Sequence, residues 1–210
     1  PADYRSYISL ARVYDLLASL KVDQAYQNAE AAYVEAIKHN PTSPSLPLML
    51  ARLEARQGNA KYTEDAVTRA LQLKPDYTDA ILFLAQVDIA RNDLASAINN
   101  TQIAAQTAPG VPSIWLQLGL LYYAGGDTKN AIAPLEQALK LQPDYANAQY
   151  FLGLSYAAQG RTQDALALFQ RLSQTNPDNA DVKSALANMG AGRKPLDNGT
   201  VSTTTGKTKK

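Results

Sequence analysis

The residue types that most often carry catalysis are scarce in this chain. His39 is the single histidine, and there is no cysteine among the 210 residues. Without a thiolate or a second imidazole the common zinc sites cannot be assembled, and a cysteine nucleophile is excluded. A serine–histidine triad would have to use His39, yet no G-x-S-x-G elbow is present to hold the serine. We therefore interpret His39, in the KHNP stretch, as a surface residue at a helix C-terminus.

Other groups that resemble reactive sites favour structural roles. Residues 206–208 read Gly-Lys-Thr, as in a phosphate-binding loop, but Val201 stands where that loop needs a glycine and no strand precedes it. Glu64 and Asp65 are predicted at the start of a helix, where acidic side chains complement the helix dipole. Three aspartates that follow prolines are predicted to cap the next helix: Asp76, Asp144 and Asp178. The sequence thus predicts a non-enzymatic protein without a metal, cofactor or nucleotide site.

Composition narrows the class of protein further. Apolar residues make up 46% of the chain and charged residues 19%, which is enough to build a packed core. Residues 1–189 hold 15 Lys and Arg against 18 Asp and Glu, so this part lacks the basic balance of a nucleic-acid-binding protein. No apolar stretch approaches the roughly 18 residues of a membrane-spanning helix. The start Pro1-Ala2-Asp3, without Met, favours a processed or excised fragment.

The C-terminal residues differ from the rest of the chain. Residues 190–210 carry five basic side chains against Asp197 alone, and they are rich in Gly, Thr and Lys. Because few apolar residues are available to pack, the composition predicts a disordered basic tail over residues 191–210.

Prolines reveal an internal period. Constant intervals of 34 residues separate Pro41, Pro75, Pro109, Pro143 and Pro177. Two near-identical segments, ALQLKPDYTDA at 70–80 and ALKLQPDYANA at 138–148, lie two periods apart. A fixed period between 20 and 50 residues indicates a repeat architecture, in which each repeat buries its apolar face only by packing on its neighbours.

The clearest repeat, residues 112–145, predicts a helical hairpin. Its first helix is indicated by a stripe at spacings of 3, 1 and 3, consisting of Trp115, Leu118, Gly119 and Tyr122. Its second helix is indicated by Ala131, Leu135 and Ala138. Between them, Gly125 and Gly126 supply the backbone freedom for a turn, and Asp127 can cap the second helix. Pro143 closes the repeat because proline cannot continue a helix.

The same pattern predicts five hairpins and a capping helix in one domain, residues 1–190. The repeat boundaries are expected at 4–43, 44–77, 78–111, 112–145 and 146–179. The first repeat is irregular, since the stretch SLKVDQAY makes it about six residues longer than the others. Residues 180–189 are predicted to cover the last hairpin, because the ends of a repeat array need a cap.

Small residues recur where paired helices are expected to approach closely. In the first helices these are Ala11, Ala51, Ala85, Gly119 and Gly153. In the second helices they are Ala36, Ala70, Ala104 and Ala138, with Leu172 as the exception. We predict that a bulky side chain at Gly119 destabilises the fold by about 1–3 kcal/mol through overpacking.

The motif W-x2-L-G-x2-Y, followed by alanine, alanine and proline at the spacings above, resembles the tetratricopeptide repeat. The resemblance covers residues 4 to about 179. It implies an all-α fold, a right-handed α-solenoid of stacked helix-turn-helix repeats whose first helices line a concave face. Pro134 lies inside the second helix of the clearest repeat, and we expect a kink there or an outward-facing site.

The resemblance also implies a binding surface on the first helices, one turn from the packing stripe. Transferred to this sequence, the partner-binding candidates are Arg5, Arg12, Arg52, Arg56, Gln86, Leu116, Leu120, Tyr123, Tyr150 and Leu154. The arginines precede the leucines and tyrosines in the chain. We expect a protein or peptide partner whose apolar side chains contact the tyrosines and whose carboxylate is bound by arginine.

Several alternatives stay open. The arginines could pair with neighbouring Asp and Glu, and the tyrosines could simply pack between hairpins. The first repeat, residues 3–41, also resembles tetratricopeptide segments that follow the membrane helices of bacterial envelope-glycan ligase or polymerase-like proteins. That alternative makes the chain an extracytoplasmic accessory domain of a larger bacterial membrane protein, and the sequence leaves open whether the chain is cytoplasmic or extracytoplasmic. Self-association through an exposed end of the array is a third alternative, and the irregular first repeat leaves it open.

Overall fold

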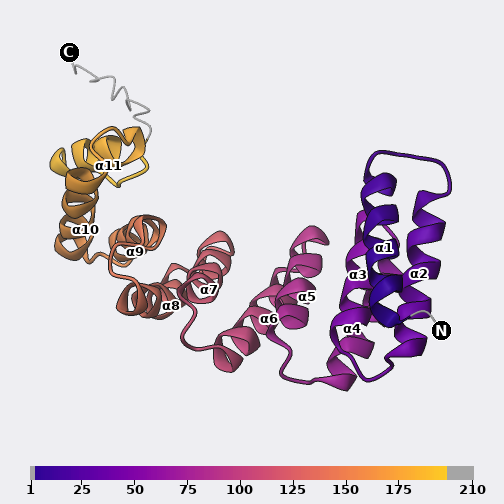
Figure 1. Ribbon diagram of the computed structural model, residues 1–210. Coiled ribbons are helices and arrows are strands. Elements are labelled where there is room, and N and C mark those ends of the chain that lie inside the picture. The colour runs from indigo at the N-terminus through magenta and orange to yellow at the C-terminus, as the bar shows by residue number, and fades with distance from the viewer. Residues whose placement is uncertain (1–2, 198–210) are drawn as a thin grey trace, which may run out of the picture. The chain divides into compact units, whose positions relative to one another are not determined.

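The structure, a computed structural model, describes residues 3–197, and every regular element in that range is a helix (Figure 1). The helices are α1 (Tyr4–Ser19), α2 (Ala25–His39), α3 (Ser45–Arg56), α4 (Ala60–Leu73), α5 (Thr78–Ala90), α6 (Leu94–Thr107), α7 (Pro112–Ala124), α8 (Thr128–Leu141), α9 (Ala146–Ala158), α10 (Thr162–Thr175) and α11 (Ala180–Gly190). Five hairpins followed by one more helix confirm the predicted all-α solenoid class. None of the helices in the described range is long and apolar enough to cross a membrane.

Contacts group the chain into two compact units that meet in sequence at Pro109 and Gly110. Unit 1 contains α1 to α6, and unit 2 contains α7 to α11. The sequence predicts a single domain over residues 1–190, whereas the structure shows two groups of hairpins that are each compact.

A residue with positive φ stands at the same repeat position in four of the hairpin turns. Gly126 has φ +79°, Gly58 and Gly160 have φ +76°, and Asn92 has φ +59°. Glycine adopts this left-handed conformation without a Cβ clash, and asparagine is among the few other residues that visit it routinely. The turn predicted from Gly125-Gly126 is therefore confirmed.

The extra residues of the first repeat extend both its first helix and its turn. Helix α1 has 16 residues, whereas the first helices of the other hairpins have 12 or 13. The longer turn contains Lys21 and Gln24, both with φ +59°.

Side-chain caps hold several helix starts. Asp127 accepts a hydrogen bond from the backbone N–H of Asn130 at 3.1 Å, so its predicted capping role is confirmed. Asp93 caps α6 in the same way, by accepting from the N–H of Ser96 at 3.1 Å. Such caps satisfy N–H groups that have no partner inside the helix.

The prediction that aspartates after prolines cap the next helices is wrong. The N-cap residues of α5 and α9 are Tyr77 and Tyr145, which follow Asp76 and Asp144 and make no side-chain capping bond. Helix α11 is capped by Asn179, not by Asp178. Asp144 pairs instead with Arg171 at 2.8 Å, and Asp178 lies 3.9 Å from Lys183.

Hairpins stack on one another within unit 1. Helix α2 packs on α1 and α3, and Ala29 and Tyr33 share a buried cluster with Ala11 and Leu53. Helix α4 packs on α3 through Ala66 and Val67, which contact Ala51. Close helix approach explains the fully buried alanines at the small-residue positions.

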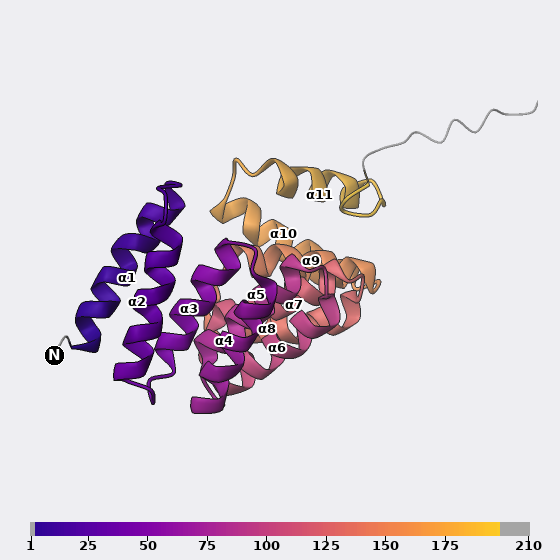
Figure 2. The ribbon, with the colours of Figure 1, turned by 90° about the vertical axis from the view of Figure 1, so that its right-hand side faces the viewer.

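The outer side of α1 is different, because no further helix covers it in the described chain (Figure 2). Val13 stands two residues after the small residue Ala11 and is 56% exposed, whereas Leu53, two residues after Ala51, is 0% exposed. The exposed apolar side chains of α1 and its turn are Leu10, Val13, Leu16, Leu20 and Val22.

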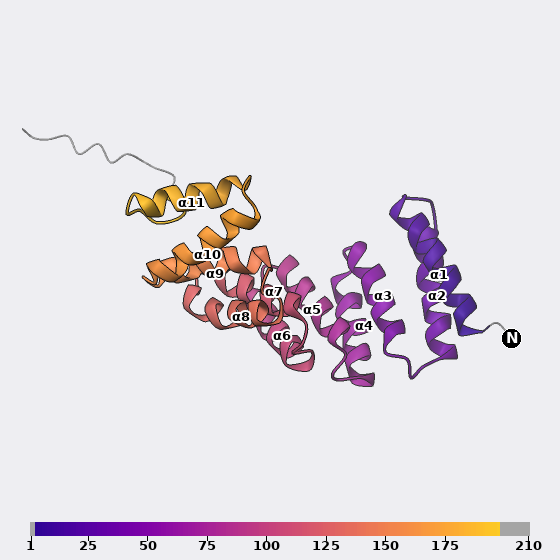
Figure 3. The same cartoon turned by 60° about the vertical axis from the view of Figure 1, so that its left-hand side comes forward.

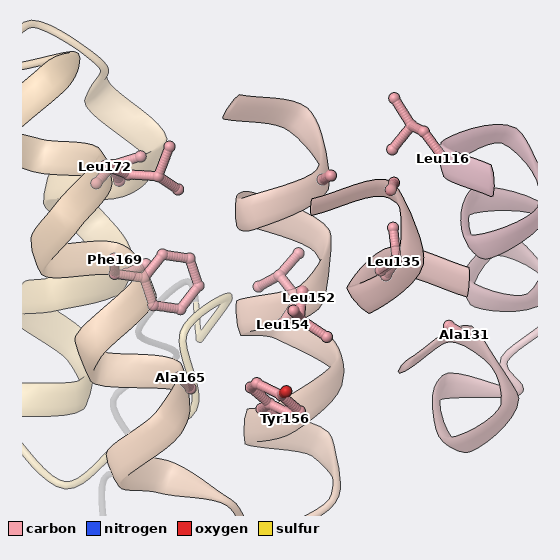
Figure 4. Close-up of a cluster of buried hydrophobic side chains, with 13 residues drawn as sticks. Leu116, Ala131, Leu135, Leu152, Leu154, Tyr156, Ala165, Phe169 and Leu172 are labelled. Carbon is pink, nitrogen blue, oxygen red and sulfur yellow. The ribbon is translucent and has the colours of Figure 1, made fainter. Parts of the chain in front are cut away.

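Unit 2 has one continuous apolar core, which runs from α7 through α8, α9 and α10 to α11. Phe169 points from α10 toward α9, and Leu135 lies on the other side of α9 (Figure 4). Helix packing leaves no room for a methyl group at Gly119 and little room at Gly153. A Cβ added to Gly119 would lie 2.5 Å from Leu135 Cγ, and one added to Gly153 would lie 3.0 Å from Phe169 Cζ.

Pro134 does not face outward, which corrects the prediction of an exposed site. It is buried in α8, and that helix continues unbroken from Thr128 to Leu141. The apolar ring thus contributes to packing, although proline has no N–H to donate to the carbonyl oxygen of Asn130 one turn earlier.

The chain after α11 turns back on the helix (Figure 3). The Asn188 side-chain amide donates to the carbonyl oxygens of Pro195 at 2.9 Å and Asp197 at 3.0 Å, and Pro195 is buried. Residues 191–197 of the predicted disordered tail therefore have a defined place. Residues 198–210, the rest of that tail, lie outside the described residues.

Candidate functional site

Two predicted arginines of unit 1 contact side chains of their own chain. Arg56 on α3 donates to both carboxylate oxygens of Asp15 on α1, in an ion pair that is partly exposed. The Arg52 guanidinium lies 5.7 Å from the ring centroid of Phe83 on α5, within the range of a cation–π contact. The alternative that arginines pair with neighbouring residues thus describes Arg56.

The other polar candidates of unit 1 stay at the surface. Arg5 lies 5.8 Å from the ring centroid of Tyr4 and donates to its hydroxyl oxygen at 3.4 Å. Arg12 and Gln86 are exposed, and neither side chain makes a hydrogen bond or ion pair with another described residue. Among the candidate arginines, Arg5, Arg12 and Arg52 could therefore bind an external carboxylate without breaking an ion pair.

The apolar candidates of unit 2 divide into core and surface. Leu116 is 6% exposed and Leu154 is 5% exposed, so both belong largely to the packed core. Leu120, Tyr123 and Tyr150 are only partly buried and pack against that core. Leu116 consequently offers little surface to a partner, whereas the two tyrosines expose part of their rings.

Aromatic side chains of α7, α9 and α10 pack edge to face in unit 2. The ring centroids of Tyr123 and Phe151 are 5.3 Å apart, and those of Tyr150 and Phe151 are 5.5 Å apart. Tyr150 also lies 5.8 Å from Phe169. Such pairs contribute about 0.5–1.5 kcal/mol beyond their buried area, so they hold the tyrosines in fixed positions. Burial raises the pKa of both Tyr123 and Tyr150.

A hollow of about 360 Å³ opens between α9 and α11. Tyr150 and Phe151 line it with aromatic surface, and Asn147 and Asp181 line it with polar side chains. Further lining residues are Ala146, Leu172, Asn176, Asn179 and Val182. The amides can donate to and accept from a peptide backbone, and the Asp181 carboxylate favours a cation.

A second hollow, of about 180 Å³, lies beside Tyr123 and Leu154. Ala157 and Ala158 complete its helical side, and Lys194, Pro195 and Leu196 line it from the segment after α11. We call the surface made by Tyr123, Asn147, Tyr150, Phe151, Leu154 and Asp181, with these two hollows, the aromatic groove.

Sequence reasoning found part of the aromatic groove. It named Tyr123, Tyr150 and Leu154, but it missed Asn147 and Phe151. These two belong to one helical face with Tyr150 and Leu154, since the four positions follow the i, i+3, i+4, i+7 series. That spacing could have identified them. Asp181 and the segment 194–196 carry no such signal, because their placement depends on how the end of the chain folds back.

Residues that could do chemistry are engaged in structural contacts. His39 ends α2 and stacks on Tyr7 with a centroid distance of 5.2 Å. Glu64 pairs with Arg91. Over residues 3–197, no three His, Asp or Glu side chains are grouped so that they could hold a metal ion. Both His39 and Glu64 therefore contribute to contacts within the fold.

A buried carboxylate of unit 1 also has a structural role. Glu54 is 2% exposed and accepts hydrogen bonds from the hydroxyl of Tyr26 at 3.0 Å and from the amide of Asn59 at 2.7 Å. Burial and the bond to Glu54 raise the pKa of Tyr26 to about 12. This network joins α2 to α3 and the following turn. The Tyr26 hydroxyl and the Asn59 amide both donate to Glu54 inside the fold.

Sequence comparison finds a known repeat family in part of the chain. A sequence profile described as "Tetratricopeptide repeat" matches residues 84–141 and 116–180. These matches run from the middle of α5 to the start of α11. No curated protein sequence is significantly similar to the chain.

Solved structures with the same fold agree with this match. MamA is 19% identical, with a TM-score of 0.67 over 84% of this chain and 93% of MamA. YrrB, described as a TPR protein with an unusual peptide-binding site, is 20% identical, with a TM-score of 0.63 over 82% of this chain and 86% of its own. PilF of Pseudomonas aeruginosa is 15% identical, with a TM-score of 0.66 over 90% of this chain and 84% of PilF. At these identities the likeness establishes the fold alone.

Proposed function

We propose that this chain, which belongs to the tetratricopeptide repeat proteins, is a non-enzymatic scaffold that binds an extended peptide in the aromatic groove of unit 2. The repeat fold supports the general role, since it is a fold of protein-interaction scaffolds. One structural neighbour, YrrB, is itself described as having a peptide-binding site. The particular surface is argued from this chain's own geometry.

The observation that supports this surface is a rigid aromatic floor next to a polar rim. Tyr150 and Phe151 are held by edge-to-face contacts, so little conformational entropy is lost when a ligand packs on them. Their hollow of about 360 Å³ is at the lower end of ligand pockets and fits one or two peptide side chains. Asn147 at its rim can bond the main chain of the peptide. Aromatic anchors with polar surroundings are typical of interaction hot spots.

We further propose that the arginines of unit 1 bind an acidic segment. Arg52 and Arg12 are exposed, and their planar guanidinium groups can each hold a carboxylate through two hydrogen bonds. Arg56 is a weaker candidate, because its Asp15 partner would have to be displaced. The two surfaces belong to different units, and each is proposed independently.

The test is a selection of short random peptides on the full chain, followed by affinity measurements on two variants. Asn147→Arg places a long side chain at the rim of the larger hollow, next to Asp181, and should weaken the selected peptides at least about tenfold. Gln170→Arg adds the same charge at an exposed α10 site that lines neither hollow, and should leave affinity unchanged. If no peptide is selected, or if both variants bind equally well, the aromatic groove is not the binding surface.

The same selection addresses the arginine surface. Peptides rich in Asp and Glu should be recovered by the wild-type chain and lost by Arg52→Glu, which reverses the charge of an exposed side chain. Acidic peptides that bind the variant unchanged would contradict this second proposal.

A further inference from the structure

The segment that follows α11 already lies in the aromatic groove. Pro195 is buried, and Lys194, Pro195 and Leu196 line the smaller hollow opposite Tyr123 and Leu154. These helical residues come from α7 and α9, the first helices of their hairpins. A stretch of the chain's own irregular backbone therefore covers part of the surface that the proposed function gives to a peptide.

The segment is held through its main chain. The amide of Asn188 donates to the carbonyl oxygens of Pro195 and Asp197, two residues apart. Asn188 itself is 9% exposed, so both of its bonds are sheltered from water. A carboxamide that donates to backbone carbonyl oxygens can bind peptides of many sequences, because these hydrogen bonds do not depend on the peptide's side chains.

The side chains of the segment indicate which peptide sequences the groove would prefer. Proline enters a bound conformation with little loss of entropy because its φ is already fixed. Leu196 remains 54% exposed, so the smaller hollow is only partly filled. The contact is therefore loose enough to be exchanged.

We propose that residues 194–197 are an internal ligand of the aromatic groove, which external peptides containing a Pro-aliphatic pair must displace. This inference rests on the proposed function, and it adds that the groove is self-occluded at its Tyr123–Leu154 end. Because the segment is tethered only a few residues after α11, it competes at an effective concentration on the order of 1 mM.

The experiment uses the full chain and a synthetic peptide, AGRKPLD, that copies residues 191–197. Pro195→Asp removes the buried ring and introduces a carboxylate that favours water, so it releases the internal segment. Arg193→Ala is the matched control, since Arg193 is exposed and lines neither hollow. Binding is followed by chemical shifts of backbone amides in α7, α9 and α11.

The added peptide should bind the Pro195→Asp chain at least about tenfold more tightly than the wild-type chain or the Arg193→Ala chain. Adding Asn188→Ala to the released chain should abolish this binding, because the amide that donates to the backbone carbonyl oxygens is gone. A segment that merely caps α11 would give no binding to the released chain. That result, or equal binding to released and wild-type chains, overturns the inference.

The peptides selected from the random library distinguish peptide binding by the aromatic groove from competition by residues 194–197. If they bind wild-type and Pro195→Asp chains equally, the groove binds peptides but the segment does not compete. If no library peptide is found and AGRKPLD still binds the released chain, the internal contact is a ligand contact and the external function fails.

Discussion

The packing of Gly119 against Leu135 leads to a prediction whose sign depends on the background. A Cβ at residue 119 would lie 2.5 Å from Leu135 Cγ and 2.7 Å from Leu135 Cδ2. Carbon atoms in contact normally stay about 3.5–4.0 Å apart, so roughly 1 Å of movement is required. Leu135 is 0% exposed and cannot move into solvent. Overpacking of this kind costs about 1–3 kcal/mol.

Helix propensity acts in the opposite direction. Replacing glycine by alanine inside a helix stabilises it by about 0.5–1 kcal/mol when the site has room. Gly119→Ala should therefore destabilise unit 2 by a net amount of about 1 kcal/mol. In a Leu135→Ala background the clashing atoms are absent, so the same substitution should stabilise by up to about 1 kcal/mol.

Urea unfolding monitored by the fluorescence of Trp115 measures these differences, since the single tryptophan of the chain lies on α7 next to Gly119. Gly153→Ala should show a smaller effect, because its added Cβ would lie 3.0–3.3 Å from the Phe169 ring. Gly190→Ala, where nothing lies within 4 Å of the added Cβ, is the unstrained control. If Gly119→Ala has the same sign in both backgrounds, the close contact with Leu135 does not explain the glycine.

Two further predictions concern buried hydroxyl groups. Thr101 Oγ1 is buried with no hydrogen-bond partner in the described chain, so Thr101→Val should stabilise unit 1 by about 1 kcal/mol in urea unfolding followed by circular dichroism. Thr63→Val, which removes a bond of 3.0 Å to a backbone carbonyl, should destabilise it by a similar amount, and equal effects would contradict the reasoning. Burial and a hydrogen bond to a carboxylate raise the pKa values of Tyr26 and Tyr156 to about 12, so two of the 12 tyrosines should ionise last in an absorbance titration. Their raised pKa values stabilise the fold fully below about pH 10, and this stabilisation should be lost as the pH rises through about 12. Tyr156→Phe should remove one of the two late ionisations.

Local signals explain why the fold could be predicted. Gly126 and Asp127 mark a turn and a helix start within a few residues, and the 34-residue period repeats that information along the chain. The errors arose where the local signal was ambiguous. Asp144 stands in a Pro-Asp-Tyr stretch that forms a turn, and α9 begins only after Tyr145. The missing N–H of Pro134 predicts a kink or an outward-facing site, and the second of these is wrong because the apolar ring packs inside.

The candidate site was less predictable because it depends on contacts between distant residues. Helical phase was enough to place Tyr123 and Tyr150 on first helices. The ion pair of Arg56 with Asp15 joins residues 41 positions apart, and no sequence pattern in either helix predicts it. Pro195 lies in a stretch whose composition predicts disorder, yet it is buried and its carbonyl oxygen accepts from the amide of Asn188.

The uncovered outer side of α1 affects the order in which the hairpins of unit 1 should unfold. In a stack of repeats, stability comes largely from interfaces between nearest neighbours. In the described part of unit 1, the α1–α2 hairpin has such an interface with the α3–α4 hairpin alone, so denaturant should open it before the α3–α4 hairpin, which has a neighbour on each side. The same bare face would accept another helical hairpin spliced on before Tyr4, and that addition would lengthen the stack while disturbing none of its present contacts.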